Sequence, residues 1–135
     1  MRWFLAIPVP AVVLLVYNAL VVLDGDPAAR LSAKVVGASL ASGAEFTLTV
    51  GEILLLVGVV SLFIEIVKAT RSSMSSAVDH ALSALVFAVY LIEFLLVKAA
   101  GTGVFLVLTV TSFLDLIAGF TVTIGAARRD LTIAR

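Results

Sequence analysis

The sequence predicts an all-α membrane protein with four transmembrane helices and a short β-hairpin between the first and second helices. Its composition is the first observation, because 62% of the 135 residues are hydrophobic, only 13% are charged and the mean hydropathy is +1.24. In soluble domains about half of the residues are apolar and about a quarter are charged. The second observation is that the apolar residues form four runs, each close to the roughly 20 residues that cross a bilayer. We expect one domain, residues 1–135, with spans at about 3–23, 50–68, 77–98 and 104–125.

Charge and residue usage exclude several functional classes. The formal net charge is zero, so no basic field favours nucleic acid as a partner. With no cysteine and one histidine, His80, the chain lacks the ligands for an iron–sulfur cluster, a bis-histidine haem or the usual zinc sites. We interpret His80, beside Asp79 at a predicted helix start, as a solvated residue, with a ligand or pH switch as the alternative. No nucleophile, base and orienting residue form a known pattern, so we expect no enzyme and no cofactor.

The first span, 3–23, is expected to be a retained helix, because its apolar run exceeds the roughly 7–15 residues of a signal-peptide core. Pro8 and Pro10 fall in its opening turns, where a missing amide donor matters least. Trp3 suits an anchor at the membrane interface. The turn residues at 24–27, with the sequence Asp-Gly-Asp-Pro, then end the helix.

A change of pattern follows between the first two spans. Residues 46–50 alternate apolar and polar with the period of two that is typical of a strand, and Ser42-Gly43 before them forms a turn signal. We therefore favour a short β-hairpin at the membrane surface. An interfacial helix over residues 32–40 is the alternative.

The second span begins with a capping box, because Thr49 and Glu52 have the spacing at which each side chain satisfies a backbone amide of the other. One face of this helix then carries a stripe suited to close approach of a neighbouring helix. Its members are Gly51, Gly58, Ser61 and Glu65. Lys68 follows Glu65 by three residues, so an ion pair on the helix surface is our first interpretation of that acid.

The last two spans are expected to form an antiparallel helical hairpin, because only five residues separate them. Ser76 and Asp79 resemble a capping box at the start of the third helix, and Gly101 is a natural C-terminal cap. The polar residues 126–130 are predicted to end the fourth helix.

Each of these two helices carries one acid far from its ends. Glu93 and Asp115 lie about 10 Å and about 17 Å from the link that joins the helices, at 1.5 Å per residue. An acid near the bilayer centre costs about 2.5 to 3.5 kcal/mol on insertion scales, so it usually has a partner or a function. We predict a polar seam inside the membrane, formed by Glu93, Asp115, Tyr90, Ser112, Thr111, Tyr17 and Asn18. Gly119 shares the stripe of Asp115 as a packing residue.

The seam has two interpretations. In the structural one, a neutral carboxylic acid donates a hydrogen bond that holds helices together within or between protomers. In the functional one, the acids relay protons or bind a cation. We favour the structural interpretation, because four helices of this size barely enclose a wet cavity without oligomerising.

Basic residues near the helix ends predict the topology. Six of them would share one side with both termini if the chain crosses four times, and three lie on the other side. The six are Arg2, Lys68, Arg71, Arg128, Arg129 and Arg135, and the three are Arg30, Lys34 and Lys98. The positive-inside rule then places both termini in the cytoplasm.

Five groups of residues carry a resemblance that covers nearly the whole chain: Gly51-Glu52, 65–71, 78–80, 91–96, and 118–123 with 128–130. They resemble a group of small, uncharacterised four-span inner-membrane proteins of Gram-negative bacteria. The resemblance implies a bacterial inner-membrane location and four spans, and it brings no activity or site. We expect a non-catalytic scaffold or accessory subunit that self-associates or docks on a larger membrane complex in the lipid bilayer. The alternative is a homo-oligomeric proton or cation channel or transporter that uses its intramembrane carboxylates.

Overall fold

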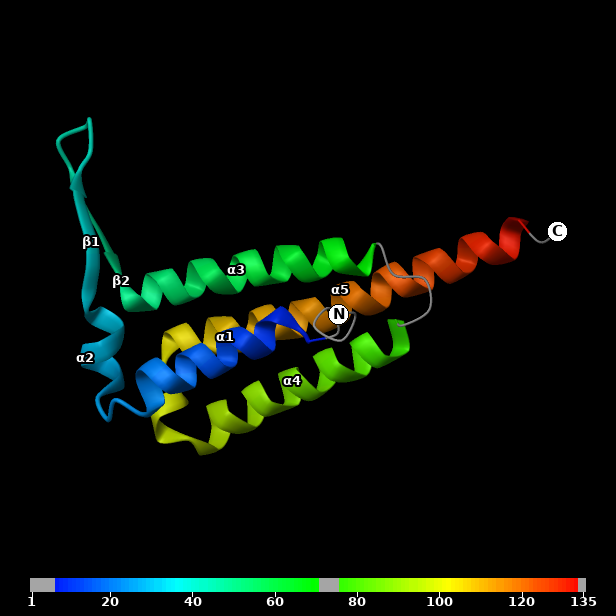
Figure 1. The fold of residues 1–135 in the computed structure, drawn as a ribbon, viewed down its shortest axis with the longest axis horizontal. Coiled ribbons are helices and arrows are strands. Elements are labelled where there is room, and N and C mark those ends of the chain that lie inside the picture. The colour runs from blue at the N-terminus through cyan, green and yellow to red at the C-terminus, as the bar shows by residue number, and fades with distance from the viewer. Residues whose placement is uncertain (1–6, 71–75, 134–135) are drawn as a thin grey trace.

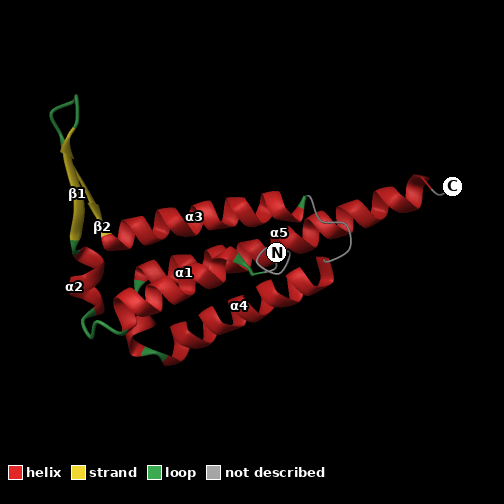
Figure 2. Ribbon diagram, in the orientation of Figure 1, coloured by secondary structure: helices red, strands yellow, loops and turns green. Residues whose placement is uncertain are grey.

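A computed structural model describes residues 7–70 and 76–133, and most of them are helical (Figures 1 and 2). Helices α1, α3, α4 and α5 pack into one bundle, and a two-stranded sheet projects from one end of it. We call this the hairpin end, and the opposite end, where α3 ends and α4 begins, the loop end. The elements in chain order are α1 (Val9–Tyr17), the π-helix η2 (Asn18–Val22), α2 (Pro27–Ser32), β1 (Lys34–Ser39), β2 (Glu45–Thr49), α3 (Val50–Ala69), α4 (Ser76–Leu96), the 3-10 helix η3 (Lys98–Ala100) and α5 (Gly103–Ile133).

Three helical stretches are long and apolar enough to cross a membrane: Val50–Ala69, Val78–Leu96 and Gly103–Val122. The first apolar stretch, Val9–Val22, is shorter, because α1 contributes nine residues and η2 five. At 1.5 Å per residue it covers about 20 Å, against a hydrocarbon core of about 30 Å. Residues 1–6, with Trp3, Arg2 and the predicted start of this span, lie outside the described residues, as do Arg71 and Arg135. The chain is therefore a helical membrane protein with three candidate spans in its described part.

The predicted helix start at the two prolines and the predicted turn at residues 24–27 are confirmed. Pro8 is the N-cap of α1 and Pro10 lies in its first turn, where neither proline removes a helical hydrogen bond. Gly25 has a φ of +84°, which only glycine adopts without strain. The Asp26 carboxylate then accepts a hydrogen bond from the Ala29 amide (3.0 Å) and caps α2.

The β-hairpin is also confirmed, and the alternative of an interfacial helix over residues 32–40 is wrong. Strands β1 and β2 pair antiparallel, with Val36 opposite Leu48 and Ala38 opposite Phe46. The tight turn between the strands places Gly43 at a φ of +82°. Extended structure prevails over residues 34–39 because β-branched valines pack well on a pleated surface and a complementary strand follows at once.

The predicted capping box at the start of α3 is confirmed as well. The Thr49 amide donates to the Glu52 carboxylate (2.8 Å), and the Glu52 amide donates to the Thr49 hydroxyl (3.3 Å). The Val50 amide donates to the Ala33 carbonyl (3.0 Å), so the start of α3 is joined to the residue between α2 and β1. The hairpin is therefore attached to the bundle through the first turn of α3.

The predicted cap of the third span at Gly101 and the predicted end of the fourth helix at residues 126–130 are both wrong. Helix α4 ends at Leu96, because Val97 is extended, and η3 intervenes before Gly101. Helix α5 does not stop near residue 125 but continues to Ile133 through the polar residues 126–130. Alanine and arginine are among the best helix formers, and polarity alone does not end a helix that can leave the membrane. At the other end of the link, the Thr102 hydroxyl caps α5 by accepting from the Phe105 amide (3.1 Å).

The predicted stripe on α3 lies buried in the bundle. Gly51, Gly58, Ser61 and Glu65 are, with Leu54, the buried residues of this helix. Gly58 allows the closest approach, because a Cβ there would lie 2.5 Å from Cδ2 of Leu108 on α5. Near the hairpin end the core contains three buried rings, with Phe105 centred 4.7 Å from Tyr17 and 5.4 Å from Tyr90. The central helix α5 thus packs against α1, α3 and α4.

Substituting Gly58 should weaken the α3–α5 contact. We expect Gly58→Ala to be less stable than Gly125→Ala by about 1 to 3 kcal/mol, the usual cost of overpacking. Both variants gain the helix propensity of alanine, but a Cβ at Gly125 meets nothing within 4 Å. The measurement is the apparent unfolding free energy in mild detergent. When Leu108→Ala is added to both variants, most of the stability difference between Gly58→Ala and Gly125→Ala should disappear. Equal stability of the two single variants would contradict the packing described.

Candidate functional site

The polar residues of the predicted seam do not form one continuous seam. Four of them belong to two separate clusters, a hairpin-end cluster and a loop-end cluster, which also contain polar residues outside the predicted seam. The hairpin-end cluster consists of Tyr17, Asn18, Glu93 and Thr102. The loop-end cluster consists of Glu65, Lys68, Asp79, His80, Ser83 and Asp115.

In the hairpin-end cluster, a side-chain amide meets an acid. The Asn18 amide nitrogen donates to one carboxylate oxygen of Glu93 at 3.1 Å, which links η2 to α4. Asn18 is the first residue of the π-helix, where the turn widens. The remaining oxygens of both side chains, Oδ1 of Asn18 and Oε2 of Glu93, are buried without a hydrogen-bond partner. The Asn18–Glu93 pair therefore has one donor group, the Asn18 amide nitrogen, and two buried acceptor oxygens that receive no hydrogen bond.

Tyr17 adds a second connection in this cluster. Its side chain is 0% exposed, and its hydroxyl lies 2.7 Å from the Thr102 hydroxyl and donates to the Ala99 carbonyl at 3.3 Å. Tyr17 thereby ties α1 to the link between α4 and α5. Sequence reasoning did not identify Thr102, although a threonine immediately before an apolar helical run is a common N-cap signal.

In the loop-end cluster, Glu65 does more than pair with Lys68. The predicted ion pair is present, with Lys68 Nζ 2.9 Å from Glu65 Oε1. The same oxygen also accepts a hydrogen bond from the Val9 amide at 2.7 Å. Lys68 Nζ in addition donates to the Ile7 carbonyl at 3.4 Å. A carboxylate at a helix N-terminus satisfies an orphan amide and complements the helix dipole, so Glu65 of α3 caps α1 from a neighbouring helix.

Asp115 belongs to this cluster and not to that of Glu93. Its side chain is 5% exposed, and the Ser83 hydroxyl of α4 lies within hydrogen-bonding reach of it. Its charged neighbours are Glu65 and Lys68 of α3. Oxygen Oδ2 of Asp115 is buried without a partner. Asp115 therefore faces both α3 and α4 from the central helix.

The other predicted seam residues lie between or beside the two clusters. The Tyr90 hydroxyl donates to the Pro10 carbonyl of α1 (3.0 Å) and not to Asp115. Thr111 bonds within its own helix, to the Val107 carbonyl (2.8 Å), and the Ser112 hydroxyl is buried without a partner. The predicted seam included Tyr17 and Asn18 of the first span but assigned no partner from α3, whereas α1, η2 and α3 supply most of the observed ones.

The loop-end cluster lines a small, partly open cavity of about 30 Å³, which is large enough for a bound water. Its lining includes His80, which is half-buried rather than solvated as predicted. The His80 ring packs on Phe120 with centroids 5.1 Å apart. A Cβ on Gly119 would lie 2.8 Å from His80 Nδ1, so the glycine makes room for the ring. Among residues 7–70 and 76–133, no group of three or more acids and histidines could hold a metal ion.

The Asn18–Glu93 pair generates a stability prediction. Glu93→Gln should be at least as stable as the native chain, because its added N–H₂ can donate to the unpartnered Oδ1 of Asn18. Glu93→Leu should lose about 1 to 3 kcal/mol, because it leaves the buried Asn18 amide unpaired. Thermal unfolding in detergent, followed by circular dichroism, measures both effects. Asn18→Leu combined with Glu93→Leu is the control and should recover part of the loss; a fully stable Glu93→Leu single variant would contradict the pairing.

Comparison with known proteins adds no relative. No protein-family model, curated protein or solved structure matches the chain. The resemblance to four-span inner-membrane proteins therefore stays a prediction, and function is inferred from the geometry of the two clusters and the exposed surfaces.

Proposed function

We propose that this chain is a non-catalytic scaffold or accessory subunit of a bacterial inner membrane, which self-associates or docks on a larger membrane complex. One observation carries the proposal: the membrane-embedded acids connect helices. Glu65 of α3 binds the start of α1, Glu93 of α4 binds η2, and Asp115 of α5 lies against Ser83 of α4. Polar side chains that hydrogen-bond across helices stabilise membrane bundles.

The topology we propose has four passes with both termini in the cytoplasm. The start of α1 is bonded to Glu65, which lies one turn from the loop end of α3, so α1 and η2 already run along most of α3. The predicted span 3–23 then completes a first pass. This arrangement places the larger group of basic residues on the cytoplasmic side.

The exposed hairpin supports a role in docking. All six residues of β1 and the first three of β2 are exposed, and they include Val36 and Phe46 at 48% and 41% exposure. A two-stranded hairpin is only marginally stable by itself in water. A partner that covers this hairpin would bury its apolar side chains and pair its free strand edges.

A proton or cation conductor is the second candidate, and the loop-end cavity favours it. The cavity is lined by titratable side chains, and the unpartnered Oδ2 of Asp115 belongs to one of them. The cavity has a volume of about 30 Å³, and Glu93 is not among the residues that line it. Conduction past Glu93 would therefore need a further water-filled space, such as one between the protomers of an oligomer.

The two candidates differ in how they respond to amide substitutions. We expect Glu93→Gln and Asp115→Asn to leave the assembly intact, and the native chain in liposomes to carry no proton flux under an imposed pH gradient. Glu93→Leu and Asp115→Leu should weaken assembly, because leucine removes the hydrogen-bonding atoms. Native flux that both amide variants abolish would overturn the scaffold in favour of the conductor.

The mass of the intact complex tests docking directly. After gentle extraction from native membrane, we expect a particle heavier than one 14.1 kDa chain, formed by further copies or by other subunits. If the hairpin docks the partner, deleting residues 35–48 should release that partner, and the particle should become lighter by more than the mass of the deleted residues. A replacement of the same residues by a glycine–serine loop is the matched control for chain connectivity, and it should behave like the deletion. A monomer from the native chain would contradict the proposal.

A further inference from the structure

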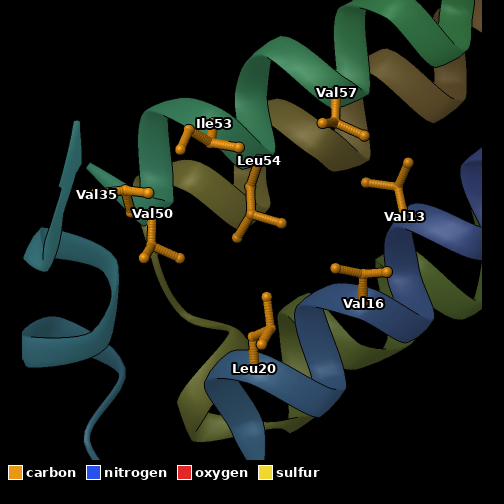
Figure 3. Close-up of a pocket in the computed structure, with 8 residues that line it drawn as sticks. All are labelled: Val13, Val16, Leu20, Val35, Val50, Ile53, Leu54 and Val57. Atoms are coloured by element: carbon orange, nitrogen blue, oxygen red, sulfur yellow. The ribbon is translucent and has the colours of Figure 1, made fainter. Parts of the chain in front are cut away.

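An apolar groove opens between α1 and α3 in the hairpin half of the bundle (Figure 3). Its volume is about 230 Å³, and all eight lining side chains are valine, leucine or isoleucine. Three come from α1 and η2, four from α3 and one, Val35, from β1. The side chains of Val16 and Leu20 on one wall face the gap that Leu54 and Val57 line on the other.

The apolar lining of this groove favours neither bound water nor an empty cavity. A bound water needs two to four polar partners, and the groove exposes no polar surface. A void leaves its lining without van der Waals contacts, which is costly in a packed structure. The groove lies beside helices that are long and apolar enough to cross a membrane, where the surrounding medium is hydrocarbon. A hydrocarbon occupant is therefore the one that the lining fits.

Two basic residues lie, along the chain, in or beside elements that meet the hairpin end of the groove, and they favour an occupant with an anionic headgroup. Val50 and Val35 line the groove where α3 and the hairpin meet, at the level expected for lipid headgroups. Lys34 precedes Val35 directly, and Arg30 lies on α2, which packs against α3 and η2. The Nε atom of Arg30 is buried without a hydrogen-bond partner. An arginine guanidinium matches the oxygens of a phosphate group.

We propose that the groove between α1 and α3 binds one acyl chain of a phospholipid, with the phosphate of that lipid at Arg30 and Lys34. Two of the nearby carboxylates are engaged elsewhere, because Asp26 caps α2 and Glu52 caps α3. A partner helix lying along the groove would meet β1, since Val35 belongs to the same lining. A single flexible acyl chain is thinner than a helix, so it is the occupant that we infer for these walls.

Photo-crosslinking of the full chain tests the acyl-chain site. The chain is reconstituted in phosphatidylglycerol vesicles that contain a trace of the same lipid with a diazirine in mid-chain, and labelled residues are located by peptide mass spectrometry. We expect label at Val16, Leu20 and Val57 well above that at Val59 and Phe63, which are 59% and 66% exposed on another face of the same helix as Val57. Equal labelling of the two sets of residues would overturn the proposal.

Filling the groove provides the variant test. Val57→Phe should lower the phospholipid retained per chain in native mass spectrometry, whereas Val59→Phe, on the opposite face of α3, is the matched control and should retain the native amount. Val57 and Val16 are 46% and 40% exposed, so phenylalanine fits at either position without entering the closed core, and Val16→Phe is the second variant. Arg30→Gln should weaken retention about tenfold, the usual effect of losing one charge-assisted hydrogen bond.

Each other outcome contradicts a stated part of the proposal. Equal retention by Val57→Phe and Val59→Phe would overturn the acyl-chain site. Unchanged retention by Arg30→Gln would overturn the assignment of the phosphate. A loss of oligomer mass in Val57→Phe without loss of lipid would show that a second copy covers the groove, and it would overturn the lipid assignment.

Discussion

Inside a bilayer no water is present to satisfy polar groups, so every helix start and every acid needs a partner within the protein. In this chain that constraint is met at Glu65, which accepts the Val9 amide at 2.7 Å and the Lys68 ammonium group at 2.9 Å. The position of α1 depends on this contact and on the bond from Asn18 to Glu93 near its other end. Two acids on two different helices therefore hold α1 against the bundle.

The polar contacts of α1 also explain where the bundle is open. Tyr17 bonds toward the α4–α5 link, and the Pro10 carbonyl accepts from Tyr90 of α4, so the polar side of α1 faces α4 and α5. Its contact with α3 in the hairpin half is purely aliphatic and incomplete, which leaves the groove of Figure 3. Hydrogen bonds thus set the orientation of α1, and the acyl chain that we propose would complete its packing. The proposed lipid site and the proposed scaffold role arise from the same division of the α1 surface.

Local signals predicted the local structure well. The capping box of Thr49 and Glu52, the two prolines of α1 and the glycine turn of the hairpin each depend on residues within four positions of one another. Predictions failed where the cause was less local. The extension of α5 to Ile133 shows that polarity does not end a helix, and half-buried His80 depends on the space beside Gly119 in another helix.

The class of protein, the apolar helices, the hairpin and the identity of the acids that need partners could all be predicted from the amino-acid sequence, because hydrophobic length and turn chemistry act along the chain. Which partner each acid has depends on how the helices pack. Glu93 and Asp115 lie on adjacent helices, yet one bonds to Asn18 and the other lies against Ser83 beside Glu65 and Lys68. This is because a helix presents several faces, and the neighbour that each face meets depends on the packing of all the helices.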